Sequence, residues 1–112
     1  MTRVTFYTAQ GQFTGFEVCG HAGYAPAGED IVCAGVSACC ELAINILSEL
    51  NDTFSCRIEA QGARIRGKLG RSDAGASQQA CQVVLRAFAH KLNALAAEYP
   101  HSLSVQLSEV SR

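Results

Sequence analysis

The chain has 112 residues, of which 48% are hydrophobic and 17% are charged. This length suits one domain with a single core, and the hydrophobic fraction excludes an intrinsically disordered chain. Nine Lys and Arg residues against ten Asp and Glu give a formal net charge of −1, so the composition does not point to a nucleic-acid-binding protein. We therefore expect one domain over residues 1–112 without a direct nucleic-acid partner.

The first residues, from Met1 to Tyr7, alternate between polar and apolar types and lack the continuous apolar segment of a signal peptide. No stretch is expected to reach the roughly 18 to 20 apolar residues that a membrane span requires. The sequence therefore predicts a cytoplasmic protein without a membrane contact. In a reducing compartment the six cysteines should remain free thiols.

The first half of the chain predicts a hairpin, a loop and a helix. Residues 3–9 and 13–19 alternate as strands do and flank a turn. Three glycines and a proline in residues 20–28 are typical of an irregular loop. Residues 31–50 repeat apolar side chains at spacings of three and four, which predicts a helix with Asp30 as its N-cap.

The second half repeats this pattern and adds a strand. Residues 54–59 and 64–69 predict a second hairpin, and a second helix is expected to begin at Ser72 and Asp73 and to run to about Tyr99. Residues 102–107 alternate again as a last strand. The order ββαββαβ predicts an α+β fold in two layers, with two helices on one face of a mostly antiparallel sheet.

Cys33 stands out among the cysteines because it falls in the first turn of the expected helix. Unpaired backbone N–H groups and the helix dipole there favour a thiolate and can also hold an oxyanion. His21 lies twelve residues upstream at a strand end, and a Cys and His pair can perform acyl transfer. Asp30 would support the helix start, and Ser37, one turn after Cys33, would bond either within the site or to the helix backbone.

Other interpretations remain open from the residues alone. Cys19, His21 and Cys33 could bind a metal ion, although their spacing is not that of a zinc knuckle, and a thiol-based redox site is a related option. The alternation of Arg64, Arg66 and Lys68 puts three cations on one strand face, either as a solvated surface or as a grip for an acidic or ribosome-associated partner.

Two segments together resemble a known signature: Gly-His-Ala at 20–22 and Gly-Glu-Asp-Ile-Val-Cys-Ala-Gly-Val-Ser at 28–37. They are similar to the signature of the ribosomal-processing cysteine protease family, called Prp, whose element order also matches. The resemblance implies that His21 and Cys33 form the catalytic pair, without a metal or other cofactor. It assigns supporting positions to Asp30 and Ser37, and it implies a mobile loop at 22–29 that contains Gly23, Tyr24 and Gly28.

The resemblance also implies a substrate and an assembly state. It predicts an endopeptidase that removes the N-terminal extension from the precursor of large-subunit ribosomal protein twenty-seven, in support of ribosome assembly, and that acts as a homodimer. The alternative is a non-catalytic ribosome-assembly binding module. Gly35 departs from the alanine that is frequent in this family at its position, but it does not touch the expected catalytic pair.

Overall fold

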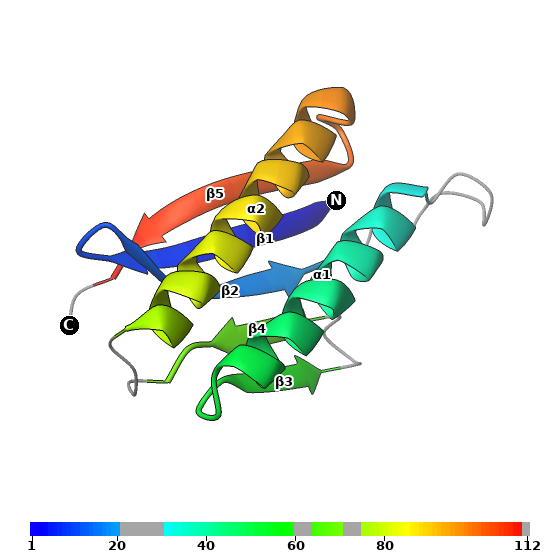
Figure 1. Cartoon of the computed structure of the whole chain (residues 1–112). Coiled ribbons are helices and arrows are strands. Elements are labelled where there is room, and N and C mark those ends of the chain that lie inside the picture. The colour runs from blue at the N-terminus through cyan, green and yellow to red at the C-terminus, as the bar shows by residue number, and fades with distance from the viewer. Residues whose placement is uncertain (21–30, 60–63, 71–74, 111–112) are drawn as a thin grey trace.

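The computed structural model describes residues 1–20, 31–59, 64–70 and 75–110. The elements follow the order ββαββαβ, as the sequence predicts (Figure 1). Their bounds are β1 Thr2–Ala9, β2 Gln12–Cys19, α1 Ile31–Leu50, β3 Ser55–Glu59, β4 Arg64–Lys68, α2 Ala76–Glu98 and β5 Leu103–Glu109.

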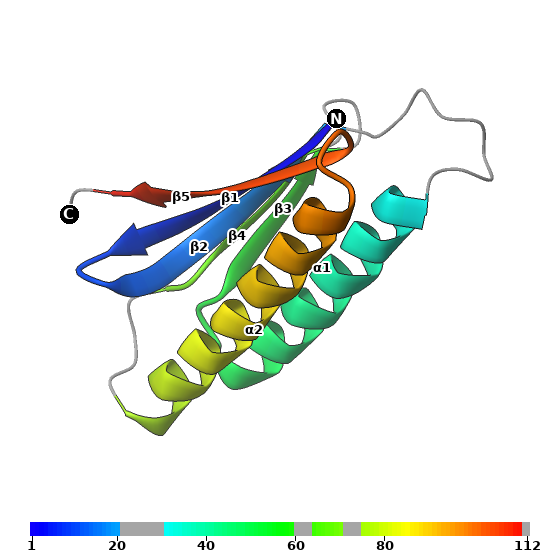
Figure 2. The same ribbon diagram turned by 90° about the horizontal axis from the view of Figure 1, so that it is seen from above.

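The five strands form one mixed sheet in the order β3-β4-β2-β1-β5. The pairs β1–β2, β2–β4 and β3–β4 are antiparallel, and β1–β5 is parallel. Both helices lie on the same face of the sheet, so the protein has two layers (Figure 2). The predicted α+β class, with a mostly antiparallel sheet and helices on one face, is confirmed.

The hairpin between β1 and β2 has a two-residue turn and a bulge. Gln10 and Gly11 both have positive φ angles, of 55° and 79°, as a turn that matches the twist of the strands requires. The register shifts between Tyr7 and Thr8. On β2, the backbone N–H of Phe13 donates to the side-chain oxygen of Gln82, and the carbonyl oxygen of Phe13 accepts from the side-chain nitrogen of Gln82, each at 2.8 Å. These two hydrogen bonds fasten α2 to β2.

The core lies between the sheet and the helices. Directly paired residues on the helix side of the sheet include Val4 with Val18 and Phe6 with Phe16, all buried. The Phe88 ring of α2 meets the Phe6 and Phe16 rings edge-on, at centroid distances of 5.3 and 5.2 Å. Apolar residues of α2 at spacings of three and four contribute to this core: Cys81, Leu85, Phe88 and Leu92 are buried, and Leu95 and Tyr99 are partly buried.

The helix α2 begins later than the sequence predicts. Its first residue is Ala76 and its N-cap is Gly75, at φ 110°, without a capping side chain. The predicted start at Ser72 and Asp73, which lie outside the described residues, is therefore wrong. The first turn is held instead by a tertiary bond, because the hydroxyl of Ser77 donates to the carbonyl oxygen of Leu50 at the end of α1.

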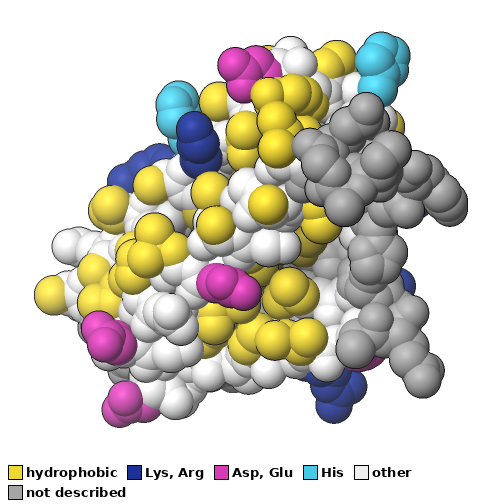
Figure 3. All heavy atoms as spheres, turned by 90° about the vertical axis from the view of Figure 1, so that its right-hand side faces the viewer, with side chains coloured by type: hydrophobic (Ala, Val, Ile, Leu, Met, Phe, Trp, Pro, Cys, Tyr) yellow, Lys and Arg dark blue, Asp and Glu magenta, His cyan; other side chains and the backbone are white. Residues whose placement is uncertain are grey.

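The helix α1 carries more apolar residues than the side that it buries in the core requires. By length and composition alone, Ile31–Leu50 could cross a membrane, so the expectation that no stretch approaches this limit is wrong. One side of the helix is part of the core, through Val32, Val36, Cys40, Ala43 and Leu47. Much of its remaining surface stays exposed, and Figure 3, which views the side on which α1 begins, shows hydrophobic side chains across this surface.

Candidate active site

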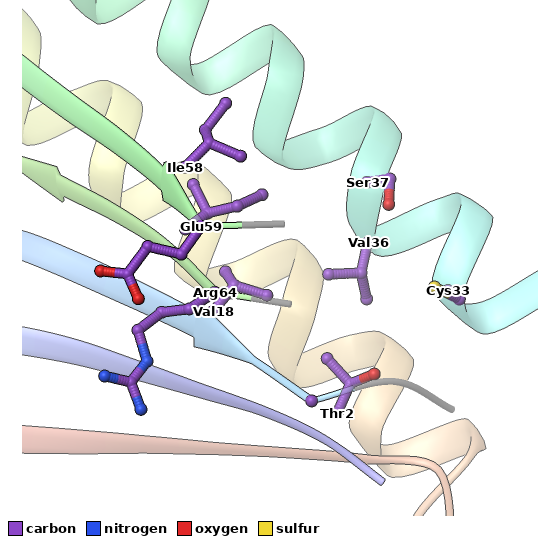
Figure 4. A pocket seen from close by; sticks show the side chains of 10 residues that line it. Thr2, Val18, Cys33, Val36, Ser37, Ile58, Glu59 and Arg64 are labelled. Atoms are coloured by element: carbon purple, nitrogen blue, oxygen red, sulfur yellow. The ribbon is translucent and has the colours of Figure 1, made fainter. Parts of the chain in front are cut away.

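Cys33 lies in the first turn of α1 and lines a cavity. The cavity has a volume of about 190 Å³ and separates the N-terminal half of α1 from the ends of β2, β3 and β4. The thiol is partly exposed, so a substrate can reach it. Figure 4 shows the side chains around it. The lining residues are Thr2, Val18, Gly20, Cys33, Val36, Ser37, Ile58, Glu59, Arg64 and Ile65.

The walls of this cavity are mainly apolar. Val18, Ile58 and Ile65 come from neighbouring strands and share the helix side of the sheet, and Val36 reaches toward them from α1 (Figure 4). Ile58 is 68% exposed although it is a large apolar residue. A peptide side chain that covered Ile58 would remove apolar surface from water close to the thiol, which favours an apolar ligand group here.

The polar side chains of the lining come from both layers. Ser37 follows Cys33 by one helical turn and lines the same cavity, as their spacing predicts. The side chains of Glu59 and Arg64 extend away from Cys33 in Figure 4. Glu59 and Arg64 are directly paired across β3 and β4, so they mark the rim of the cavity at the strand ends.

Thr2 is a residue of this cavity that the sequence analysis missed. It is 2% exposed, and its hydroxyl oxygen is buried with no hydrogen-bond partner among the described residues. A buried hydroxyl without a partner costs about 1 to 3 kcal/mol, so such groups call for an explanation. The alternation of β1, which puts Thr2 on the same face as Val4 and Phe6, was the available signal.

The chain is tightly packed where β2 ends beside this cavity. Gly20 has a φ of 87°, and a Cβ atom at this position would lie 2.5 Å from the carbonyl oxygen of Met1. Only glycine fits both the backbone conformation and the space. The end of β2 is thereby fixed beside Thr2 and the Cys33 cavity.

Several predicted site residues lie outside the described residues, and their placement is not described. They are His21, Asp30, Gly23, Tyr24 and Gly28. Of the predicted site residues, the structure places Cys33 and Ser37, and it places them on one cavity.

Cys19 does not converge with Cys33. Cys19 pairs with Arg3 and Arg64 on the face of the sheet that points away from the helices, whereas Cys33 lies on the helix side. Within the described ranges, no group of three His, Cys, Asp or Glu side chains could hold a metal ion. The structure therefore offers no support for a metal site built on Cys19 and Cys33.

Two other cysteines are poor nucleophiles at neutral pH. Burial, and to a smaller extent the neighbouring Cys56, Glu41 and Cys39, raise the pKa of Cys40 from 9.0 to about 12. Burial also raises the pKa of Cys56. Because the thiolate is the reactive form, the thiols of Cys40 and Cys56 are held in their unreactive form.

Comparisons with known proteins agree on one family. Residues 1–104 match the sequence profile of the family described as cysteine protease Prp. No curated protein matches the sequence. The crystal structure of SMU.848 from Streptococcus mutans is similar, with a TM-score of 0.82, 27% identity, and coverage of 98% of this chain and 96% of that one.

Two structures of an essential ribosomal processing protease Prp from S. aureus are also similar. The one with a covalently linked product peptide has a TM-score of 0.81 and 23% identity, and the one with a substrate peptide has a TM-score of 0.80 and 22% identity. Each alignment covers 96% of this chain and 100% of that one. At these identities the two structures support the fold.

The raised pKa of Cys40 predicts that this thiol resists alkylation in the folded protein. At pH 8, iodoacetamide should leave Cys40 unmodified until urea unfolds the chain, because burial blocks access and the folded thiol ionises only as the pH approaches about 12. Site-resolved mass spectrometry measures this, and the variant Cys40→Ala should show the same modified sites when folded. The same pKa difference implies that folding stability falls as the pH rises from about 9 to 12, because only the unfolded chain releases this proton. Modification of Cys40 as fast in the folded chain as in the urea-unfolded chain would contradict the raised pKa and the burial of this thiol.

Proposed function

The chain belongs to the cysteine protease Prp family, which makes it a cysteine peptidase, and we propose that Cys33 is its nucleophile. The observation that carries this proposal is the position of Cys33, in the first turn of α1 and on an open, mainly apolar cavity. The N–H groups of a first helical turn have no partners within the helix and point toward bound negative charge. A nucleophile and an electrostatic stabiliser thus lie at one place.

The reaction follows from this arrangement. The thiolate of Cys33 attacks the scissile carbonyl carbon, and the first-turn N–H groups of α1 stabilise the oxyanion of the tetrahedral intermediate. Collapse of the intermediate breaks the C–N bond, the amine product leaves with a proton, and a thioester remains. Water then hydrolyses the thioester and restores the thiol. We assign the proton transfers to His21 on the basis of the matching signature, with Asp30 and Ser37 in supporting positions.

The substrate we propose is a ribosomal protein precursor. The similar S. aureus protein is a ribosomal processing protease, and its structure contains a substrate peptide. For this chain we propose removal of the N-terminal extension of large-subunit ribosomal protein twenty-seven, in the cytoplasm, where ribosomes are assembled. The exposed Ile58 and the other apolar walls of the cavity support a peptide with apolar side chains near the scissile bond.

The test of this proposal is the conversion of the extended precursor by Cys33→Ala. Loss of the sulfur should abolish cleavage, measured by the mass of the precursor after incubation, while the melting temperature stays within a few degrees of the wild type. The matched control is Cys56→Ala, which removes an exposed thiol away from the cavity and should cleave normally.

Cleavage by Cys33→Ala at the wild-type rate would disprove the role of Cys33. A wild-type chain that binds the precursor but never shortens it would favour the alternative, a non-catalytic ribosome-assembly binding module.

We further propose that the Thr2 hydroxyl bonds to the backbone of the bound peptide. Its oxygen is buried without a partner among the described residues, and Thr2 lines the cavity of Cys33 (Figure 4). A peptide group within this cavity offers both an N–H donor and a C=O acceptor, and a hydroxyl can bond to either. The hydrogen bond would form on peptide binding. The free-energy penalty of the unpaired hydroxyl would then apply only to the enzyme without substrate.

Thr2→Val tests this role because valine keeps the shape and removes the hydroxyl. We expect kcat/KM for the precursor to fall about 3- to 10-fold, as for one lost hydrogen bond, while the unfolding temperature stays equal or rises because an unpaired polar group is removed from the interior. Thr2→Ser should retain activity. Equal activity of the valine variant and the wild type would exclude a role for the hydroxyl, and a lowered unfolding temperature would point to a structural role.

We propose that the chain acts as a homodimer through the outer surface of its helices. A groove of about 310 Å³ runs between α1 and α2. It is lined mainly by apolar residues, among them Leu42, Ile46 and Val83, and by Lys91. Leu42 and Val83 are 61% and 53% exposed. A second copy that covered this groove would bury apolar surface that the monomer leaves in water.

Leu42→Glu should shift the chain toward the monomer in sedimentation equilibrium, because it places a charge in the proposed interface. The matched control is Leu107→Glu, since Leu107 is 67% exposed on β5 and does not line the groove. A wild-type chain that sediments as a monomer, or a dimer that Leu42→Glu leaves intact, would contradict the proposed interface.

A further inference from the structure

The sheet face opposite the helices is polar and carries most of the basic residues of the sheet. Directly paired residues share a face, and the registers put three rows on this side. Among the described elements, no helix covers this face (Figure 2). The rows across β1, β2, β4 and β3 are Arg3, Cys19, Arg64, Glu59; then Thr5, Glu17, Arg66, Arg57; then Tyr7, Gly15, Lys68, Ser55.

This uncovered face is basic although the whole chain is nearly neutral. It carries five cations and two anions, against a net charge of −1 for the full sequence. One cation is already paired, because the Arg66 Nε lies 2.6 Å from a carboxylate oxygen of Glu17. The fold therefore concentrates cations on one face of a protein that is nearly neutral as a whole. A net charge near zero does not exclude an anionic partner for that face.

The same face contains a hollow with an aromatic wall. The hollow has a volume of about 520 Å³ and is lined by Tyr7, Gly15, Glu17, Arg66 and Lys68, among others. Gly15 lies between Tyr7 and Lys68 in its row and provides no side chain, so it forms an open floor. A Cβ atom on Gly15 would lie 2.5 Å from the Gly67 carbonyl oxygen, so the sheet enforces this gap.

We propose that this face binds single-stranded RNA, with a base stacked on Tyr7 and phosphates on the neighbouring cations. Open sheets bind single strands through exposed aromatic rings and basic side chains. Here Lys68 lies at the hollow, and Arg57 extends the cationic surface onto β3. The hollow is of a size that takes a small planar group. The site is separate from the Cys33 cavity and does not depend on the peptidase activity.

RNA fits this face better than an acidic protein does. The cations alone would suit either partner, because both are anionic. A protein surface that binds only carboxylates does not need an aromatic hollow, whereas this face has one beside Tyr7, with Gly15 at its floor. The pairing of Arg66 with Glu17 also provides hydrogen-bonding groups at the hollow for the edge of a base.

Fluorescence anisotropy with a labelled oligouridine of about 12 nucleotides tests this proposal. Binding should weaken as salt rises. Tyr7→Ala should weaken binding about tenfold through lost stacking, and Tyr7→Phe should retain it. The double variant Arg57→Ala with Lys68→Ala should bind more weakly and lower the salt slope by about 1.4, or about 0.7 for each lost phosphate contact.

The matched control is Arg86→Glu, which makes the same change in net charge on α2, lies outside the groove between the helices and should leave binding unchanged. Precursor cleavage by every variant should equal that of the wild type, since none of these residues lines the Cys33 cavity, and this shows that each variant is folded. No RNA binding by the wild type, or an equal loss in the α2 control, would overturn the proposal. Equal binding of poly-glutamate, unaffected by Tyr7→Ala, would assign the face to an acidic protein instead.

Discussion

The packing of α1 against α2 is the contact on which the rest of the site depends. Within the described chain the backbone of α1 approaches the backbone of α2 at more positions than that of any strand, and the Ser77 hydroxyl ties α2 to the last turn of α1. α2 in turn is fastened to the sheet by Gln82 and by the Phe88 ring. α1 is therefore held above the sheet by its neighbour, and space remains between its first turns and the strand ends. Cys33 lines that space.

The elements of the fold were predictable because local patterns and tertiary structure agree. The alternation in β1 and the spacing of Cys81, Leu85, Phe88 and Leu92 in α2 correspond to the faces that are buried. The start of α2 was not predictable in the same way. Ser72 and Asp73 are common capping residues, but Gly75 is the cap, and the hydrogen bond that holds the first turn comes from Ser77 to a distant residue.

The site residues differ in the same way in how far the sequence predicts them. The place of Cys33 in the first turn of α1 was predictable from the apolar spacing of the helix, and the place of Ser37 on the same cavity followed from helical spacing. Their roles in catalysis stay predictions. Thr2 was missed because the alternation of β1 indicates only the face on which it lies, whereas the burial of its hydroxyl without a partner among the described residues depends on the tertiary structure. The basic sheet face was predictable only in part. The alternation of Arg64, Arg66 and Lys68 places these three cations on one strand face, as predicted, but only the registers bring Arg3 and Arg57 from other strands onto the same surface.

The parallel pairing of β1 with β5 has a consequence for the order in which the protein is completed. Thr2 donates its backbone N–H to the carbonyl oxygen of Ser102 at 2.9 Å, so the first strand obtains its second neighbour only when the last strand arrives. Contacts between such distant residues form late, because the chain must first close a long loop. One wall of the Cys33 cavity is thus ordered only after almost the whole chain has been synthesised.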